Sequence, residues 1–293
     1  MIQSTDFFYP LIDDAFLMGR VTCANVLSDL FAIGVTQIDS LNIIMSACEQ
    51  MTPGEQQAVI PTIIAGMKSV AMSADIKNIS LNQIVINPWC MIGGTATAIV
   101  TEKEFISPIN AQVGDYLILT KPLGGQIACL AQIRAREADK WENLKKHFTQ
   151  SELHAAHTSA LDFMMTLNKD AAELMHKYNC HAATDVTGYG ILGHAQNLAK
   201  YQKNNVKFIL HTMPVIKNVL KMAEAMGMSQ KLLRGSSPET SGGLLISINK
   251  DCIENFREDL VRMNEEANCW IVGIVEEGDR TAELSQHPNI IEV

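Results

Sequence analysis

The stretch AATDVTGYGILGHA, residues 182–195, combines one carboxylate at Asp185 with hydroxyls at Thr184 and Thr187 and with three glycines. Asp and Thr supply hard oxygen donors, and glycines let a ligand come close to the backbone. The apolar pair at 191–192 indicates the start of a helix, whose first N–H groups can bind an anion. The stretch predicts contact with a metal–phosphate ligand, although a loop in which Asp185 or Thr187 caps the helix fits it equally well.

The composition indicates a folded protein. Of the 293 residues, 47% are hydrophobic and 19% are charged, which suits one large domain or two, with two favoured. The net charge of −9 argues against a nucleic-acid partner, but a bound divalent metal would still allow a nucleotide. We find no apolar run of about 18 residues and no signal peptide, so no membrane partner is expected.

The seven cysteines contain no CxxC pair. Neither a zinc site nor a disulfide framework is therefore indicated. A reduced, cytoplasmic protein is the simplest interpretation. Strand-like apolar residues already occur at 7–11, so we expect that the natural chain begins further upstream.

Hydrophobic spacing predicts an α+β protein of two domains, residues 1–109 and 110–293, separated at the break SPINAQVG. In the first domain, the pattern predicts helices at 20–33 and 53–72 and a strand at 39–47. Residues 84–100 are predicted to form a strand pair or one long strand, broken at 87–88 and 93–94. In the second domain, it predicts strands at 116–119, 206–210, 244–248 and 270–275, the last of these being the final strand, and helices at 151–178, 214–226 and 251–265.

Two further aspartates, Asp6 and Asp29, lie in small, oxygen-rich contexts. Asn25 and Asp29 are four residues apart, so a helix places them on one face. For this pair alone, a polar helix edge on which they bond to each other fits slightly better than a ligand contact. Together, Asp6, Asp29 and Asp185 fit magnesium better than zinc, and a metal-bridged triphosphate would explain how an acidic protein holds a polyanion. No P-loop or dinucleotide-binding motif is present.

Three other features have weaker signals. The loop PETSGG at 238–243 precedes a strand and either closes over the site or forms a tight turn, with equal weight. Lys121 could neutralise phosphate, but a single lysine in a turn is more typically solvated. His194 is near Asp185, and we interpret it as structural.

Six segments together resemble the selenophosphate synthetase (selenide, water dikinase) family. They are STDFFYPLIDD, GRVTCANVLSDLFAIGV, NPWCMIGGTATAIV, LTKPLG, AATDVTGYGILGHAQNLAK and SPETSGGLL. They occur in the family's order and cover nearly the whole chain. The family belongs to the aminoimidazole ribonucleotide synthetase-like superfamily. The resemblance therefore implies two α+β domains, with a homodimer formed through a shared N-terminal β-barrel and ATP in a cleft near that interface.

The resemblance also implies residue roles. Asp6, Asp29 and Asp185 match aspartates that hold magnesium against the ATP phosphates, while Thr5 and Asn25 lie in nucleotide-contacting segments. The implied enzyme is a magnesium-dependent transferase. It converts ATP, selenide and water into selenophosphate, orthophosphate and AMP for selenocysteine biosynthesis.

Two departures from the family pattern affect these expectations. The family's catalytic cysteine or selenocysteine and its lysine lie in a glycine-rich N-terminal segment that the 293 residues do not include, so we expect this chain to be inactive alone. Residues 81–84, LNQI, replace the family's GGxT, whose glycines allow close approach to the nucleotide. This second departure motivates an alternative, a catalytically silent paralogue that acts as a dimeric binding or regulatory protein. A purine-pathway or hydrogenase-maturation ATPase is a further alternative, which the NVLSD and ETSGG segments disfavour.

Overall fold

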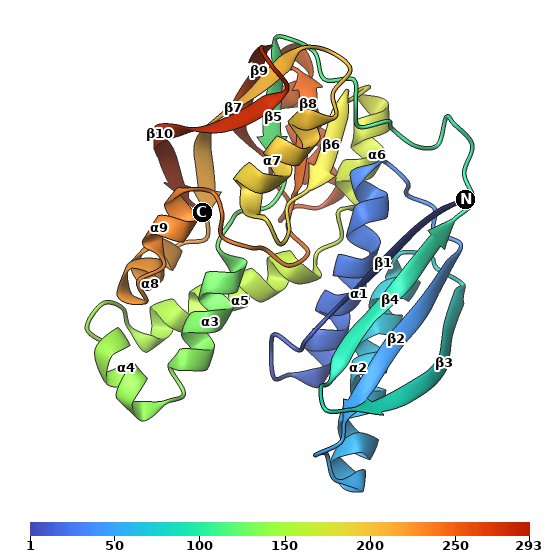
Figure 1. The fold of residues 1–293 in the computed structure, drawn as a ribbon, viewed down its shortest axis with the longest axis vertical. Helices are drawn as coiled ribbons and strands as arrows, with labels where there is room; N and C mark the ends of the chain where they lie inside the picture. Colours follow the sequence, from blue (N-terminus) through green and yellow to red (C-terminus); the bar gives the residue numbers. More distant parts are fainter.

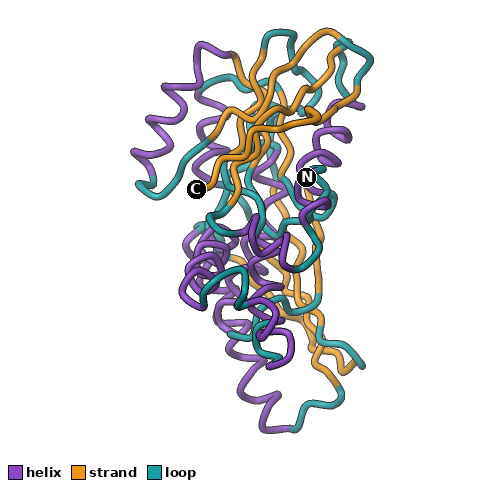
Figure 2. Tube along the Cα trace, turned by 90° about the vertical axis from the view of Figure 1, so that its left-hand side faces the viewer, coloured by secondary structure: helices purple, strands orange, loops and turns teal.

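The computed structural model describes all 293 residues and contains two sheets, each with helices packed against it (Figure 1). The first sheet has four strands in the order β1-β4-β2-β3, and the second has six in the order β10-β7-β9-β5-β8-β6. Figure 2 shows the helices of the lower half gathered on one side of its strands. One face of the four-stranded sheet therefore has no helix against it.

The N-terminal part contains β1 (Ile2–Phe8), α1 (Ala15–Ala32), β2 (Ser40–Cys48), α2 (Pro53–Ser73), β3 (Asn78–Asn87) and β4 (Met91–Ala98). Alternate residues of β2, such as Leu41 and Ile43, are buried in the core beneath the helices. The two helices approach closely at Gly19 and Gly66, where an added Cβ would lie 2.0 Å from a backbone oxygen of the other helix. These glycines allow α1 and α2 to pack closely against each other.

The C-terminal part starts at β5 (Asp115–Leu119), and the linking segment 99–114 contains the predicted domain boundary. It continues with α3 (Gly125–Arg134), α4 (Ala138–Leu144), α5 (Gln150–Met165), α6 (Lys169–Lys177), β6 (Ala182–Asp185), α7 (Gly190–Lys200), β7 (Val206–Val215), α8 (Val219–Ala225), α9 (Ser229–Leu233), β8 (Leu244–Asn249), the 3-10 helix η1 (Lys250–Cys252), α10 (Ile253–Met263), β9 (Trp270–Glu277) and β10 (Thr281–Glu292). Its main core contains 35 buried apolar residues, and a second cluster of 14 lies beneath α6 and α10.

Several elements differ from the sequence prediction, and the helices α3, α4 and α9 were not predicted at all. The helix expected over 151–178 is divided into α5 and α6, because Thr166 has an extended backbone with ψ of 128°. The helix expected from 214 begins only at Val219, because β7 extends to Val215. The strand β10 was not predicted. It pairs with β7 at the sheet edge, and its proline at 288 lies at a register shift, which hides the strand pattern in the sequence.

The expectation that no segment is long and apolar enough to span a membrane is wrong for α1. This helix has 18 residues and a mean hydropathy of 1.2, which pass that test by length and composition. In the structure, 72% of the helix is buried inside the protein, where it packs against α2 and the four-stranded sheet. Such burial is typical of a core helix in a folded domain.

Candidate functional site

Helix α1 connects the two sheets through one polar face. Asn25, Ser28 and Asp29 are three and four residues apart and therefore neighbours on the helix surface. The Asn25 Nδ2 donates a hydrogen bond to Asp6 Oδ2 on β1. The Ser28 Oγ donates to Asp185 Oδ2 at the end of β6, at 2.6 Å. The helix thus brings an aspartate from each sheet to the same place.

Asp29 completes an acidic cluster with Asp6 and Asp185. It is exposed and accepts a hydrogen bond from Ser4 Oγ at 2.5 Å. Burial raises the pKa of both Asp6 and Asp185, and the nearby charge of Asp29 raises each pKa further. Like charges act in this way only at short range. The three aspartates singled out from the sequence therefore converge on one cluster.

Asn25 does not bond to Asp29, which was the alternative left open by the sequence. Its Nδ2 is used by Asp6, and its Oδ1 accepts the backbone N–H of Ser241 at 2.7 Å. Asn25 is 6% exposed, so these contacts fix a buried amide rather than a surface edge. The side chain therefore joins β1 to the loop before β8.

The acidic cluster is not a complete metal-binding set by itself. No three Asp, Glu, His or Cys side chains lie close enough together to hold a metal ion. Its chemistry nevertheless fits magnesium, which takes hard oxygens, keeps several waters and relies on substrate phosphates for further ligands. A zinc site would instead require nitrogen or sulfur ligands in a closed arrangement. The cluster suits a magnesium ion that is shared with a phosphate.

Thr5 lies away from this cluster. Successive strand residues face opposite sides of a sheet, so Asp6 faces α1 and Thr5 faces outward. The Thr5 hydroxyl lies 2.8 Å from the Thr95 hydroxyl on β4. Within one chain, the structure does not bring Thr5 to the aspartates.

The loop after Asp185 is not the capped loop that one interpretation of its sequence predicted. No side chain caps α7, so neither Asp185 nor Thr187 satisfies its first turn. The Leu192 N–H, one of the early donors of the helix, is bonded to the Gly235 carbonyl oxygen at 3.0 Å. Thr187 Oγ1 instead lies 3.2 Å from His194 Nε2, which fits the interpretation of His194 as a structural residue.

The loop 236–243 packs directly against the Asp185 loop. The backbone N–H of Glu239 donates to the Thr187 carbonyl oxygen at 3.0 Å. The Glu239 side chain is buried and accepts the N–H groups of Gly124 and Gly125 at 2.6 and 2.9 Å. Burial raises the pKa of Glu239 to about 8, although the two N–H donors oppose this shift. The loop therefore ties the α3 start to the site.

Lys121 is buried, so the expectation that it is solvated is wrong. It is 4% exposed, and its Nζ donates to the carbonyl oxygens of Thr166 and Ser241 at 2.6 and 2.8 Å. Burial lowers its pKa to about 7. The two partners lie 45 and 120 residues away in sequence, so no local pattern could have indicated this position.

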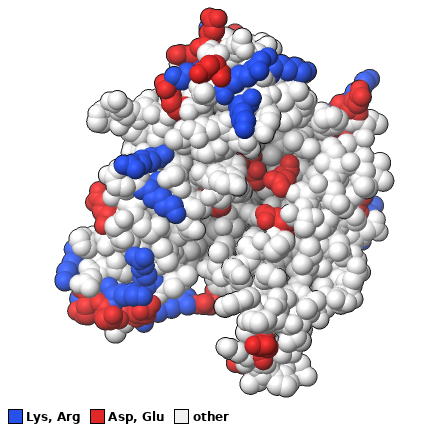
Figure 3. Space-filling model, viewed as in Figure 1, with Lys and Arg blue, Asp and Glu red and all other residues white.

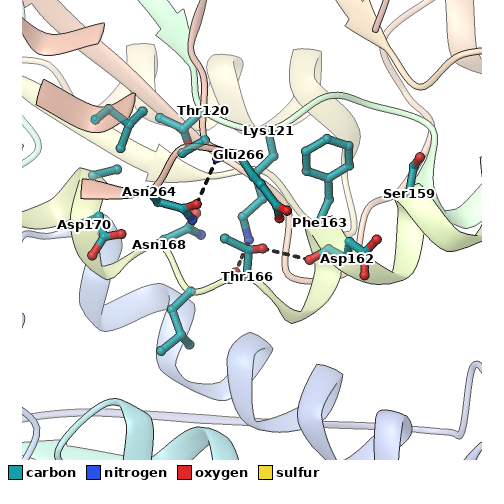
Figure 4. Close-up of a pocket in the computed structure, with 14 residues that line it drawn as sticks. Thr120, Lys121, Ser159, Asp162, Phe163, Thr166, Asn168, Asp170, Asn264 and Glu266 are labelled. Atoms are coloured by element: carbon teal, nitrogen blue, oxygen red, sulfur yellow. Dashed lines mark hydrogen bonds between the residues drawn. The ribbon is translucent and has the colours of Figure 1, made fainter. Parts of the chain in front are cut away.

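A pocket of about 210 Å³ lies beside Lys121 (Figure 4). Asn168, which the sequence analysis missed, lines this pocket. Its Nδ2 donates to Ser28 Oγ at 3.2 Å and to the Gly242 carbonyl oxygen at 2.8 Å. Figure 4 shows the Lys121 and Thr166 side chains close together at the pocket wall. Through Ser28, Asn168 thus links the pocket wall to Asp185.

The unusual segment 81–84 lies far from Asp6 in the sheet. It belongs to β3 at one edge, whereas Asp6 is on β1 at the opposite edge, with β4 and β2 between them. Leu81 packs against the N-terminal core, and Ile84 is 38% exposed. Within a single chain, this departure does not alter the walls of the acidic cluster.

Figure 3 shows acidic side chains on the walls of the hollow between the two halves of the molecule.

A family model and solved structures of similar proteins show the fold class of this chain. Residues 112–284 match the family model described as "AIR synthase related protein, C-terminal domain". A thiamine-monophosphate kinase from Stenotrophomonas maltophilia K279a has a TM-score of 0.73 at 18% identity, over 98% of this chain and 85% of that one. The hydrogenase maturation protein HypE in complex with ATP has a TM-score of 0.69 at 14% identity, over 94% and 77%. The chain therefore has the AIR synthase-like fold.

Relatives with similar sequences show the family within this fold class. The chain is 45% identical to selenide, water dikinase 2 of Mus musculus, over 100% of this chain and 65% of that protein. It is 40% identical to selenide, water dikinase of Dictyostelium discoideum, over 100% of this chain and 82% of that protein. The chain belongs to the selenide, water dikinase family. It spans 65% of the length of the mouse and human relatives.

Proposed function

We propose that this chain forms the ATP- and magnesium-binding part of an enzyme that converts ATP, selenide and water into selenophosphate, AMP and orthophosphate. The names of the relatives support a dikinase that acts on selenide. The ATP complex of a protein with a similar fold supports ATP as the nucleotide. We also propose a cytoplasmic location, which fits the seven free cysteines.

The convergence of Asp6, Asp29 and Asp185 carries this proposal. The three carboxylates come from distant segments, and the charge of Asp29 raises the pKa of both Asp6 and Asp185. Lys121 is close enough to influence Asp185, but its hydrogen bonds go to two carbonyl oxygens. Such a cluster is stable as an ionised set when a divalent cation shares its charge.

The proposed roles follow from the contacts. Asp6, Asp29 and Asp185 would hold magnesium together with phosphate oxygens and waters. Asn25 orients Asp6, and Ser28 orients Asp185. When bound, magnesium supplies charge neutralisation for the phosphates and helps to orient them. The contact between Thr5 and the nucleotide stays a prediction.

Magnesium dependence of ATP binding tests the proposal. We expect the wild-type chain to bind ATP with magnesium and to lose measurable binding when a chelator is added. Asp29→Ala should weaken binding about tenfold or more, since contacts between charged groups exceed the 1.4 kcal/mol that corresponds to tenfold. Asp139→Ala, at an exposed position on α4, is the matched control and should bind as wild type does. Binding without magnesium would contradict the proposal.

We further propose a homodimer formed through the uncovered face of the four-stranded sheet. Phe7, Tyr9 and Trp89 at this end of the sheet are 53%, 57% and 61% exposed, and Tyr9 stacks edge-on against Trp89. Large exposed apolar groups of this kind favour a protein partner. Sedimentation at micromolar concentration should give about twice the chain mass of 32.2 kDa, and a monomer would contradict this proposal.

The silent-paralogue alternative has less support. Its motivation was the segment 81–84, which lies at the sheet edge opposite Asp6. All three predicted magnesium-binding aspartates are present in one cluster, and the relatives are named as kinases. An enzyme is therefore the function that the observations favour.

A further inference from the structure

The loop 236–243 contains two buried hydroxyl groups without a hydrogen-bond partner, those of Ser237 and Ser241. A buried hydroxyl in this state has lost its bonds to water with nothing in exchange, so each case calls for an explanation. Ser237 lines a small apolar cavity beside Leu123, Ile191 and Met213 in the C-terminal core. Ser241 has different surroundings, and these point to a ligand.

Ser241 is held by Asn25, which bonds to Asp6 of the acidic cluster, and by Lys121. Its N–H donates to Asn25 Oδ1 at 2.7 Å, and its carbonyl oxygen accepts from Lys121 Nζ at 2.8 Å. Two residues further on, the Gly243 carbonyl oxygen accepts the N–H of Val186, next to Asp185, at 3.0 Å. The backbone of Ser241 is therefore fixed between α1, Lys121 and the Asp185 loop.

The backbone of Ser241 is also strained. Its φ is +47°, in the left-handed region that favours glycine, and glycines follow directly at 242 and 243. The residue is 1% exposed, so the surrounding contacts hold it in this conformation. Strain of this kind, retained within a polar cluster, is typical of a ligand-contacting position.

The chemistry of the cluster lacks a free neutral donor. The carboxylates of Asp6, Asp29 and Asp185 only accept hydrogen bonds when ionised, and Lys121 already donates to two carbonyl oxygens. A phosphate that enters with magnesium needs donors for the oxygens that the metal does not contact. A serine hydroxyl can donate one hydrogen bond and adds no charge.

We propose that the Ser241 Oγ donates a hydrogen bond to a phosphoryl oxygen of ATP beyond the α-phosphate. The inference rests on the proposed function, because it requires that ATP binds at the acidic cluster. The hydroxyl is shielded from water, so the contact requires rotation of the side chain or a small shift of the loop. Ser241 is thus a contact residue for the nucleotide, in addition to the aspartates.

The test compares the affinities for ATP and AMP, both with magnesium, in three variants. Ser241→Ala should weaken ATP binding about tenfold, the loss expected for one hydrogen bond to a charged group, and leave AMP binding within about twofold. Ser237→Ala is the matched control, because it removes the other unpaired hydroxyl of the same loop. It should bind both nucleotides as wild type does.

Ser241→Gly separates the hydroxyl from the backbone strain. Glycine relieves the left-handed conformation, so a purely conformational role predicts wild-type ATP affinity for this variant. The proposed hydrogen bond predicts an affinity as low as that of Ser241→Ala. Thermal unfolding of each variant shows whether it remains folded.

The binding and unfolding results either support or overturn the proposed hydrogen bond of Ser241. If wild type binds ATP and Ser241→Ala binds it equally well, the inference fails while the proposed function stands. Equal losses for ATP and AMP with a lower unfolding temperature would assign Ser241 a structural role and also overturn it. If the wild-type chain itself does not bind ATP with magnesium, the proposed function fails, and the inference fails with it.

Discussion

Asp115 and Asp185 are two buried aspartates of the same sheet with opposite surroundings. They are 3% and 5% exposed, and both lie on strands that pair with β8, at its opposite ends. Asp115 accepts the Ser247 hydroxyl at 2.6 Å and the Gln112 N–H at 2.9 Å, and His181 Nδ1 lies 2.7 Å away. Burial alone therefore does not distinguish a functional carboxylate from a structural one.

Asp185 has a single side-chain donor, Ser28, and another carboxylate, Asp29, nearby. The protein thus supplies Asp115 with enough donors to satisfy it and leaves Asp185 short of them. A carboxylate short of donors is costly in the free chain but can bind a cation. We therefore expect a stabilising role for Asp115, and the proposed ligand-binding role of Asp185 would explain its shortage of donors.

The largest expected effect is the loss of stability in Asp115→Ala. This substitution leaves a buried hydroxyl and a part-buried N–H without their acceptor, so the free energy of unfolding should fall by about 3 kcal/mol. Urea denaturation measures it, with Asp251→Ala at an exposed position as control. A loss below about 1 kcal/mol would show that the Asp115 network contributes little.

Asp185→Asn should have the opposite effect on stability. Burial and Asp29 raise the pKa of Asp185, so the folded chain binds this proton more tightly than the unfolded chain. The contribution of this group is fully present below about pH 4 and decreases as the pH rises through the raised pKa. Without metal, Asp185→Asn should raise the free energy of unfolding by about 1 to 2 kcal/mol at pH 8 and by nearly nothing at pH 4. A lower stability than wild type at pH 8 would contradict the comparison.

The smallest expected effects come from the serines that donate to each aspartate. Ser247→Ala should lower the free energy of unfolding by about 1 kcal/mol and leave ATP affinity unchanged. Ser28→Ala should instead weaken ATP binding several-fold, because Asp185 loses the donor that orients it. Unfolding and binding measurements on both variants test this pair. A loss of ATP affinity in Ser247→Ala would remove the distinction between the two sites.

The sequence predicted much of the cluster because its residue types are chemically specific. Asp6, Asp29 and Asp185 stand in small, oxygen-rich segments, and their convergence required only that α1 lie between the sheets. Asn168 and the burial of Lys121 could not be predicted, because their partners lie in other elements far along the chain. Hydrogen-bond partners set by tertiary packing leave no periodic pattern in the sequence.

Local sequence patterns also predicted only part of the fold. The apolar periodicity predicted α1 and most strands of both sheets. The end of α5 at Thr166 and the strand β10 were missed, because the residues involved have no strong local preference and depend on packing. The strand β10 exists through its pairing with β7, which no local pattern indicates.

Calorimetric titration of ATP with magnesium into wild type and Asp185→Ala tests the central claim most directly. The claim is that Asp185 is left short of donors because it binds magnesium together with ATP. We expect wild type to bind ATP only with magnesium and Asp185→Ala to bind it about tenfold or more weakly, with its fold intact. Equal affinity in the two proteins, or ATP binding that a chelator does not change, would contradict the claim.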